Sequence, residues 1–149
     1  MAIARGAGTE ILRSAHYEIV DSTTSNLIWG VQHHIYTVLS VIVYCKSVNT
    51  DRNYAQLRIT GYDVKEGTTN SDMTVFQQDF SQYETFVWND KFSFNGHEPT
   101  NFTGPLDDAT KQDAVADQGS SVATKLRMAT EHADDDFSVH VSYIDQNNA

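Results

Sequence analysis

The stretch Gln32–Lys46, QHHIYTVLSVIVYCK, decides the fold of this chain. Most of its residues from Ile35 onward are β-branched, aliphatic or aromatic, the side chains that favour β-strands. Successive side chains of a strand point to opposite faces, and here both faces are largely apolar. This pattern is typical of a central strand that is covered on both sides. One face would carry Ile35, Thr37, Leu39, Val41, Val43 and Cys45, and the other Tyr36, Val38, Ser40, Ile42 and Tyr44.

The rest of the chain also follows the two-residue period of strands, and the 3.6-residue period of helices is nearly absent. Polar segments separate the alternating stretches, as expected for turns. Seven or eight short strands in this arrangement predict an all-β fold, an antiparallel β-sandwich of jelly-roll or Ig-like type. The pattern leaves the strand connectivity open. The other expected strands are Ile11–Ile19, Leu27–Trp29, Tyr54–Tyr62, Met73–Phe80, Glu84–Phe94 with a bend at Asn89-Asp90, Val122–Thr130 and Phe137–Tyr143.

Three segments fall outside this strand pattern. Asp63–Asp72 is polar and is expected to be an exposed loop, and Asn95–Asp108 holds both prolines of the chain. One short helix is expected at Leu106–Asp117, because Pro105 stands near its first turn and Gly119 near its end. The domain organisation that follows is a flexible N-terminal arm at 1–10, one sandwich domain at 11–145 and a frayed tail at 146–149.

Composition narrows the possible functions. The chain has 149 residues, of which 40% are hydrophobic, so one domain with a substantial core is expected. A net charge of −10 argues against nucleic acid and anionic lipid as partners, because both are negatively charged. The first residues do not resemble a signal peptide, and no apolar run is long enough to span a membrane. A single cysteine excludes an intrachain disulfide.

His33, His34 and Cys45 are the first candidates for a metal or catalytic site. Neighbouring residues of a strand point to opposite faces, so the two imidazoles cannot easily bind one metal. Cys45 lies about eleven residues further along the same strand, or roughly 35 Å, too far to join either histidine. The favoured interpretation is that both histidines are polar residues entering a strand and that Cys45 is a core thiol. We therefore expect no chemistry from them.

The turn around His132, with Asp134, Asp135 and Asp136, is the second candidate. Clustered carboxylates suit Ca²⁺, which prefers oxygen ligands, but the glycine and the terminal glutamate of an EF-hand loop are absent. A charged hairpin loop is the favoured interpretation. No nucleophile elbow, Gly-rich phosphate loop or HExxH motif is present. The sequence thus predicts a protein without enzymatic activity, metal or cofactor.

Aromatic residues are numerous for so small a sandwich, and any that face outward would mark a subunit interface or a ligand platform. The candidates are Trp29, Tyr83, Trp88, Phe92, Phe94 and Phe102.

Three stretches, taken in order, carry a resemblance to a known group of proteins. They are YTVLSVIVYCKSVNTDRNYAQLRITGYD (Tyr36–Asp63), QDFSQYETFVWNDKFSF (Gln78–Phe94) and KLRMATEHADDDFSVHVSYID (Lys125–Asp145). An apolar strand runs into a reversal and an alternating strand, and the chain closes on an acidic turn and a last alternating strand. In this pattern the sequence resembles small tailed-phage virion proteins built as β-sandwiches. It departs from their simplest members in the long Asn95–Gln118 insertion.

The resemblance implies a capsid decoration (cement) protein or a tail or fibre component, commonly assembled as a trimer or another ring. It supplies no catalytic residues. The leading hypothesis is therefore a decoration protein that binds across subunits of the major capsid protein, or another virion protein, in a virion assembled in the host cytoplasm. Ile3, Arg5 and Ile11 are the expected contact residues. The alternative is a tail-fibre or receptor-binding module that contacts a host glycan through loops such as Asp63–Asp72 and Asn95–Gly104.

Overall fold

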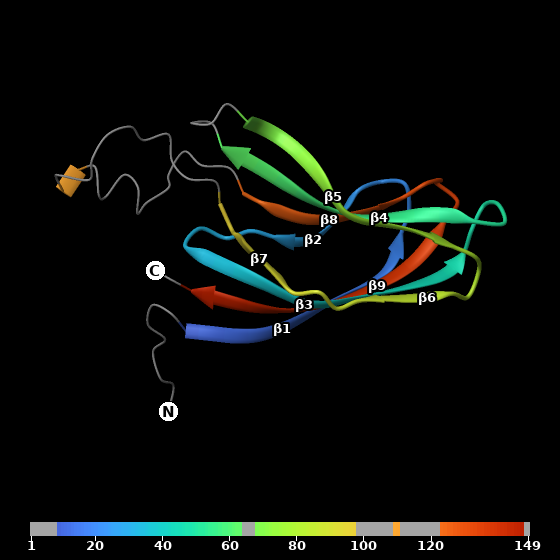
Figure 1. Ribbon diagram of the computed structural model, residues 1–149, viewed down its shortest axis with the longest axis horizontal. Helices are drawn as coiled ribbons and strands as arrows, with labels where there is room; N and C mark the ends of the chain where they lie inside the picture. The colour runs from blue at the N-terminus through green and yellow to red at the C-terminus, as the bar shows by residue number, and fades with distance from the viewer. Residues whose placement is uncertain (1–8, 64–67, 98–108, 111–122, 148–149) are drawn as a thin grey trace.

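The computed structural model describes residues 9–63, 68–97, 109–110 and 123–147. Two antiparallel sheets pack face to face, one below the other in Figure 1. The first sheet has the strand order β1-β9-β3-β6, with β7 also paired to β3, and the second has the order β2-β8-β4-β5. The first sheet comprises β1 (Thr9–Val20), β9 (Asp136–Asn147), β3 (His34–Ser47), β6 (Thr85–Trp88) and β7 (Phe92–Asn95). The second comprises β2 (Ser25–Trp29), β8 (Lys125–Thr130), β4 (Asn53–Asp63) and β5 (Thr68–Phe80).

The connectivity is that of a jelly roll. The chain passes from one sheet to the other after β1, β2, β3, β5, β7 and β8, and β6 and β7 together occupy one edge position. The double-sheet jelly roll has eight strand positions, whereas an Ig-type sandwich divides its strands differently between the sheets. The expected all-β antiparallel sandwich is confirmed, and of the two types the strand order is that of the jelly roll.

The core lies between the two sheets and is built from alternate residues of each strand. Aromatic rings fill its centre: the Phe80 ring lies 5.2 Å from that of Phe137, and the Phe76 ring 5.1 Å from that of Phe86. Burying such side chains contributes about 1.5–3 kcal/mol each. The residues with no exposed surface include Val20, Val38, Val41, Val43, Cys45, Ala55, Leu57, Leu126, Met128, Phe137, Val139 and Val141.

Strand β3 is central in its sheet, as expected. Its side chains, however, do not alternate strictly between the inner and the outer face along the whole strand. The pairing with β9 shifts register between Val38 and Ser40, which reverses the inside and outside positions along the strand. Tyr36 and Val38 therefore join Val41 and the residues after it in the core. Within the described residues only this inner face is covered. The expectation that β3 is covered on both sides was wrong for the single chain.

Three expected boundaries also moved. Strand β5 begins at Thr68, because the second half of the expected loop pairs with β4. The expected strand Glu84–Phe94 is divided into β6 and β7, which pair with different parts of β3. Strand β9 runs to Asn147 and pairs with β1 and β3 there, so the tail expected to fray begins inside a sheet. The expected helix lies outside the described residues, apart from Ala109 and Thr110.

Backbone hydrogen bonds join the two sheets at one end of the sandwich. Gly30 N–H donates to Thr124 O at 2.8 Å, Thr124 N–H donates to Gly96 O at 2.9 Å, and Gly96 N–H donates to His34 O at 2.8 Å. The two glycine backbones approach so closely that a Cβ on Gly30 would lie 2.0 Å from Gly96 O. This end of the molecule therefore requires glycine at both positions.

Candidate functional site

Of the three residues expected to contact a partner, only Ile11 lies within the described residues. Ile3 and Arg5 lie outside them. Ile11 is half-buried on β1, opposite Asp145 of β9. The more exposed apolar residue of this strand is its neighbour Leu12, whose exposed fraction is 70%.

The two neighbouring histidines lie at the start of β3 in different environments. His33 adopts a positive φ of 67° in the turn before the strand. The His34 ring lies with Nδ1 2.5 Å from Asp145 Oδ1, so this nitrogen donates to the carboxylate. Among the described residues, no group of three or more His, Cys, Asp or Glu side chains could hold a metal ion. The Asp145–His34 pair orients the ring, and no described hydroxyl or thiol bonds to it as a nucleophile would.

The acidic turn around His132 is a structural cap. Asp135 is 2% exposed, and its carboxylate accepts hydrogen bonds from Asn49 N, Asn53 Nδ2 and His132 N at 3.0, 2.6 and 2.9 Å. The carboxylate thus joins the β3–β4 turn to the β8–β9 turn. The turn is a charged loop, as expected, but not a hairpin, because β8 and β9 lie in different sheets and do not pair.

Cys45 is fully buried, and burial raises the pKa of its thiol to about 11. At pH 8 the side chain is therefore the neutral thiol, which is a poor nucleophile. We expect the native protein to resist alkylation by iodoacetamide at pH 8 and the denatured protein to react fully, as mass spectrometry would record. Stoichiometric labelling without denaturant would show that the core around Cys45 opens.

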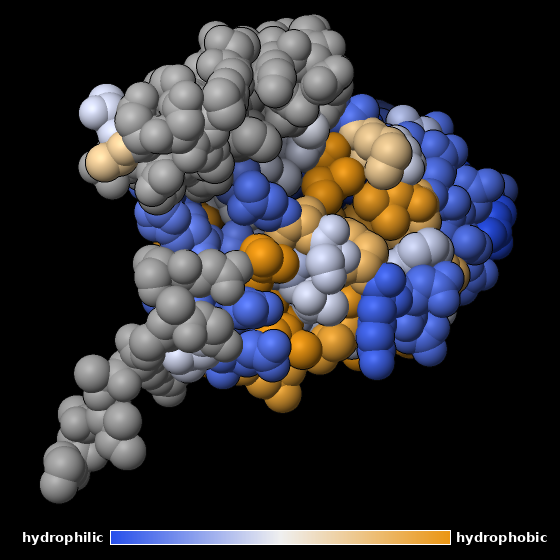
Figure 2. All heavy atoms as spheres, turned by 60° about the vertical axis from the view of Figure 1, so that its left-hand side comes forward, coloured by the Kyte–Doolittle hydropathy of each residue, from blue (hydrophilic) through white to orange (hydrophobic). Residues whose placement is uncertain are grey.

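The aromatic residues divide into core and surface. Trp88, Phe92 and Phe94 are partly buried and pack against the core. Figure 2 shows apolar side chains reaching the surface in the middle of the visible face. Trp29 and Tyr83 are 57% and 70% exposed. The ammonium group of Lys125 lies 4.0 Å from the centre of the Trp29 ring, so one face of that indole is occupied.

The outward-facing side of the first sheet is a candidate interaction surface. Its three central rows, read across β1, β9, β3 and the edge strands, contain no Asp, Glu, Lys or Arg. We call these residues the outer face. No described element covers it (Figure 1). The rows are Leu12-Ile144-Thr37-Ser93, Ser14-Ser142-Ser40 and His16-His140-Ile42-Val87.

The outer face combines exposed apolar residues with a row of serines. Leu12, Val87 and Ile42 are 70%, 50% and 38% exposed. The serines are small, so a partner could approach the backbone closely along the middle row. Charged residues begin only beyond these rows, as at Glu18, which bonds to His16 and Lys46. This distribution is unusual on a chain with a net charge of −10.

The second sheet presents a different surface. Trp29 and Met73 are exposed on this sheet, but charged and polar side chains lie among its strands and bond to one another: Arg58 and Gln77 both bond to Gln56, and Arg127 pairs with Asp72 at 3.3 Å. These charged and polar side chains already have partners within the sheet. The two outer surfaces of the sandwich thus differ in chemistry, and only that of the first sheet lacks charge in its centre.

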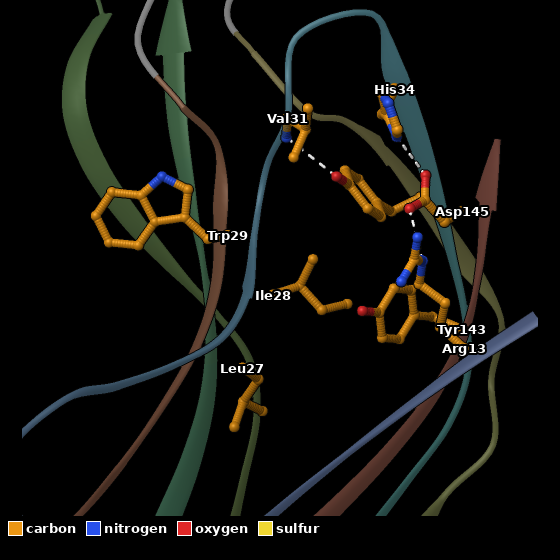
Figure 3. Close-up of a pocket in the computed structure, with 9 residues that line it drawn as sticks. Arg13, Leu27, Ile28, Trp29, Val31, His34, Tyr143 and Asp145 are labelled. Carbon is orange, nitrogen blue, oxygen red and sulfur yellow. Dashed lines mark hydrogen bonds and ion pairs between the residues drawn. The ribbon is translucent and has the colours of Figure 1, made fainter. Parts of the chain in front are cut away.

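A pocket of about 260 Å³ lies between the sheets, at the side where β1 and β2 form the edges. Figure 3 shows Arg13, Tyr143, Asp145 and His34 gathered on one side of it, with Leu27 and Ile28 of β2 opposite. The indole of Trp29 points away from this group.

A buried carboxylate organises the polar side of the pocket. Asp145 is 6% exposed, and its two oxygens bond to Arg13 Nε at 2.9 Å and to the His34 ring. Burial raises the pKa of Tyr36 to about 12, and burial also raises the pKa of Tyr143, so both phenols stay neutral. No local sequence pattern indicates this cluster, because Asp145 lies more than 100 positions from both Arg13 and His34.

Comparisons with known proteins add little to this geometry. No family model matches the sequence, and no curated protein matches it. A solved structure described as "Bacillus endospore appendages form a novel family of disulfide-linked pili" is similar with a TM-score of 0.39 and 10% identity, covering 100% of this chain and 97% of that chain. At this TM-score and identity the likeness carries no information about function. No described helix is long and apolar enough to cross a membrane.

Proposed function

We propose that this protein is a non-enzymatic structural subunit of a virion, a capsid decoration protein whose outer face lies against the shell. One observation supports the proposal most: the outer face, centred on β3 and β9, carries no Asp, Glu, Lys or Arg, exposes Leu12, Ile42 and Val87, and is covered by no described part of the chain. A second molecule would supply the missing cover. Depletion of charged residues is also the compositional mark of the centre of a protein interface.

The dimensions of the outer face suit such a contact. The outer face is four strands wide, and neighbouring strands lie about 4.8 Å apart. Along the strands it extends from the Glu10 row to the Glu18 row, at about 3.3 Å per residue, so its area is on the order of 500 Å². A standard interface buries about 800 Å² on each partner, so further contacts are needed. Residues 1–8, with Ile3 and Arg5, directly precede β1 in the chain and are our candidates for these contacts.

The net negative charge of the chain also supports an orientation with the outer face on the shell. With the outer face on the shell, the acidic remainder of the chain is directed to solvent and keeps a high-copy protein soluble. Assembly as a trimer on a local three-fold axis would multiply modest contacts into tight binding. Binding to the assembled shell and not to its free subunits stabilises the shell by mass action.

The alternative, a receptor-binding module for a host glycan, has less support among the described residues. A sugar stacks on an open aromatic ring, but Lys125 occupies one face of Trp29, the exposed tryptophan. Residues 64–67 and 98–104 of the two candidate glycan loops lie outside the described residues. Binding to a glycan array, without binding to shells, would favour this alternative.

The proposal predicts that a charge on the outer face abolishes shell binding. Ile42→Glu and Leu12→Glu each place a carboxylate where the partner would exclude water, at a cost of about 3 kcal/mol or a hundredfold in affinity. The measurement is co-sedimentation with empty shells of the major capsid protein, with light scattering to give the native mass. We expect saturable binding of the wild-type protein and loss of binding by both variants.

Gln77→Glu is the matched control, because it adds the same charge to the outer surface of the second sheet. Its shell binding should equal that of the wild-type protein. Equal binding by all variants would reject the outer face as the contact surface. Failure of the wild-type protein to co-sediment would reject capsid decoration itself.

A further inference from the structure

We propose that the pocket between β1, β2, β3 and β9 binds a small organic acid, a carboxylate attached to a short apolar body. The pocket faces the interior of the sandwich and shares no residue with the outer face. The inference therefore stands independently of the shell contact.

Asp145 does not act as a free acid in this pocket. One of its oxygens accepts from Arg13 Nε and the other from His34 Nδ1, so its charge is already compensated. Its role is to hold the guanidinium and the imidazole in place. A cationic ligand would have to compete with Arg13 for this carboxylate, which argues against an amine as the ligand.

The remaining polar groups of the pocket are mainly donors. The two terminal nitrogens of Arg13 make no hydrogen bond with a described residue, and with 49% of the side chain exposed they are open to a ligand. The Tyr36 oxygen accepts from Val31 N–H at 3.0 Å, so its own hydrogen is free to donate. The Tyr143 hydroxyl makes no hydrogen bond with a described residue and lies on the same side as Arg13 (Figure 3).

An excess of donors around a guanidinium selects a ligand rich in acceptors. The planar fork of arginine matches the two oxygens of a carboxylate, and charge-assisted bonds of this kind are the stronger ones. The opposite wall consists of Leu27 and Ile28, and the ring of Tyr143 lies 6.0 Å from that of Tyr36. These groups suit an aliphatic or aromatic body. A volume of about 260 Å³ is below the usual range for drug-sized ligands, so the acid is small.

Benzoate is a suitable probe, and benzamide is its uncharged counterpart of nearly the same shape. Titration followed by ¹H–¹⁵N NMR would report on the amide of Val31, which bonds to Tyr36, and on the Nε–H of Arg13. We expect saturable shifts at both groups with benzoate and at least tenfold weaker binding of benzamide. Equal binding of the two compounds, or no saturable shift up to about 10 mM benzoate, would overturn the proposal.

Four variants complete the test. Arg13→Gln should weaken benzoate binding at least tenfold, and Tyr143→Phe, which leaves the Arg13–Asp145 pair intact, about threefold to tenfold. Arg52→Gln is the matched control, because Arg52 is also 49% exposed and paired with a carboxylate, that of Glu84. Wild-type binding by the Arg13 variant would reject the site. Ile42→Glu should bind benzoate normally, so a failure of the shell contact and a failure of this site are distinguishable.

Discussion

Gly30→Ala is expected to prevent folding or to destabilise the protein by more than about 3 kcal/mol. The added Cβ would lie 2.0 Å from Gly96 O and 2.5 Å from Thr124 O, and both are backbone atoms that cannot turn aside. To make room, the two sheets would have to separate at the point where Gly30, Gly96 and Thr124 join them. The measurement is urea unfolding followed by tryptophan fluorescence.

Gly96→Ala should behave in the same way, since its Cβ would lie 2.2 Å from Val31 O. Gly61→Ala is the control, because Gly61 is an exposed residue of β4. This variant should remain within about 1 kcal/mol of the wild-type protein. Near-native stability of Gly30→Ala would mean that the two sheets do not meet at this end as described.

Asp135→Ala is expected to cost about 3–5 kcal/mol, lowering Tm by on the order of 10 °C. The carboxylate is buried and accepts three hydrogen bonds, two from backbone N–H groups and one from the Asn53 side chain. Its removal would leave the buried Asn53 amide unsatisfied, at a cost of about 1–3 kcal/mol, and would also remove two charge-assisted hydrogen bonds from the backbone N–H groups of Asn49 and His132. Differential scanning calorimetry is the appropriate measurement.

Asp134→Ala provides the comparison within the same turn. Its carboxylate is exposed and makes only a 3.7 Å ion pair with His132, so the expected change is within about 0.5 kcal/mol. Similar losses for the two variants would show that the turn is stabilised by its overall charge and not by the buried cap. A rise in the Tm of the wild-type protein on addition of Ca²⁺, absent in the Asp135 variant, would revive the metal interpretation.

Local patterns were sufficient to find the strands. The side-chain period of two is visible within a few residues, and turn residues mark where each strand ends. The errors occurred where pairing, and not composition, determines the boundary. Thr68–Asp72 is polar enough for a loop, yet it pairs with β4, and Gln146 and Asn147 pair with β1. The residue types of these two segments do not indicate that they pair with another strand.

The sequence indicated part of the candidate interaction surface, but as a second buried face of the strand that became β3. The second apolar face of β3 was interpreted as a face covered within one chain, and Ile35 and Ile42 instead remain 37% and 38% exposed. The hydrophobic pattern reports that a surface tends to be covered but not by which molecule. The serine row could not be found in advance, because Ser14, Ser142 and Ser40 come from three strands.

The sequence by itself determined the fold class, the central position of Gln32–Lys46 and the inert character of Cys45, because alternation and composition are local properties. The tertiary structure alone decided the jelly-roll order, the reversal of the faces of β3 at its bulge, the contact between Gly30 and Gly96, and the gathering of Arg13 and His34 around Asp145. These features depend on contacts between residues far apart in the chain, such as Arg13 and Asp145, which are 132 positions apart. Their formation is governed by sheet register and packing, which no short segment encodes.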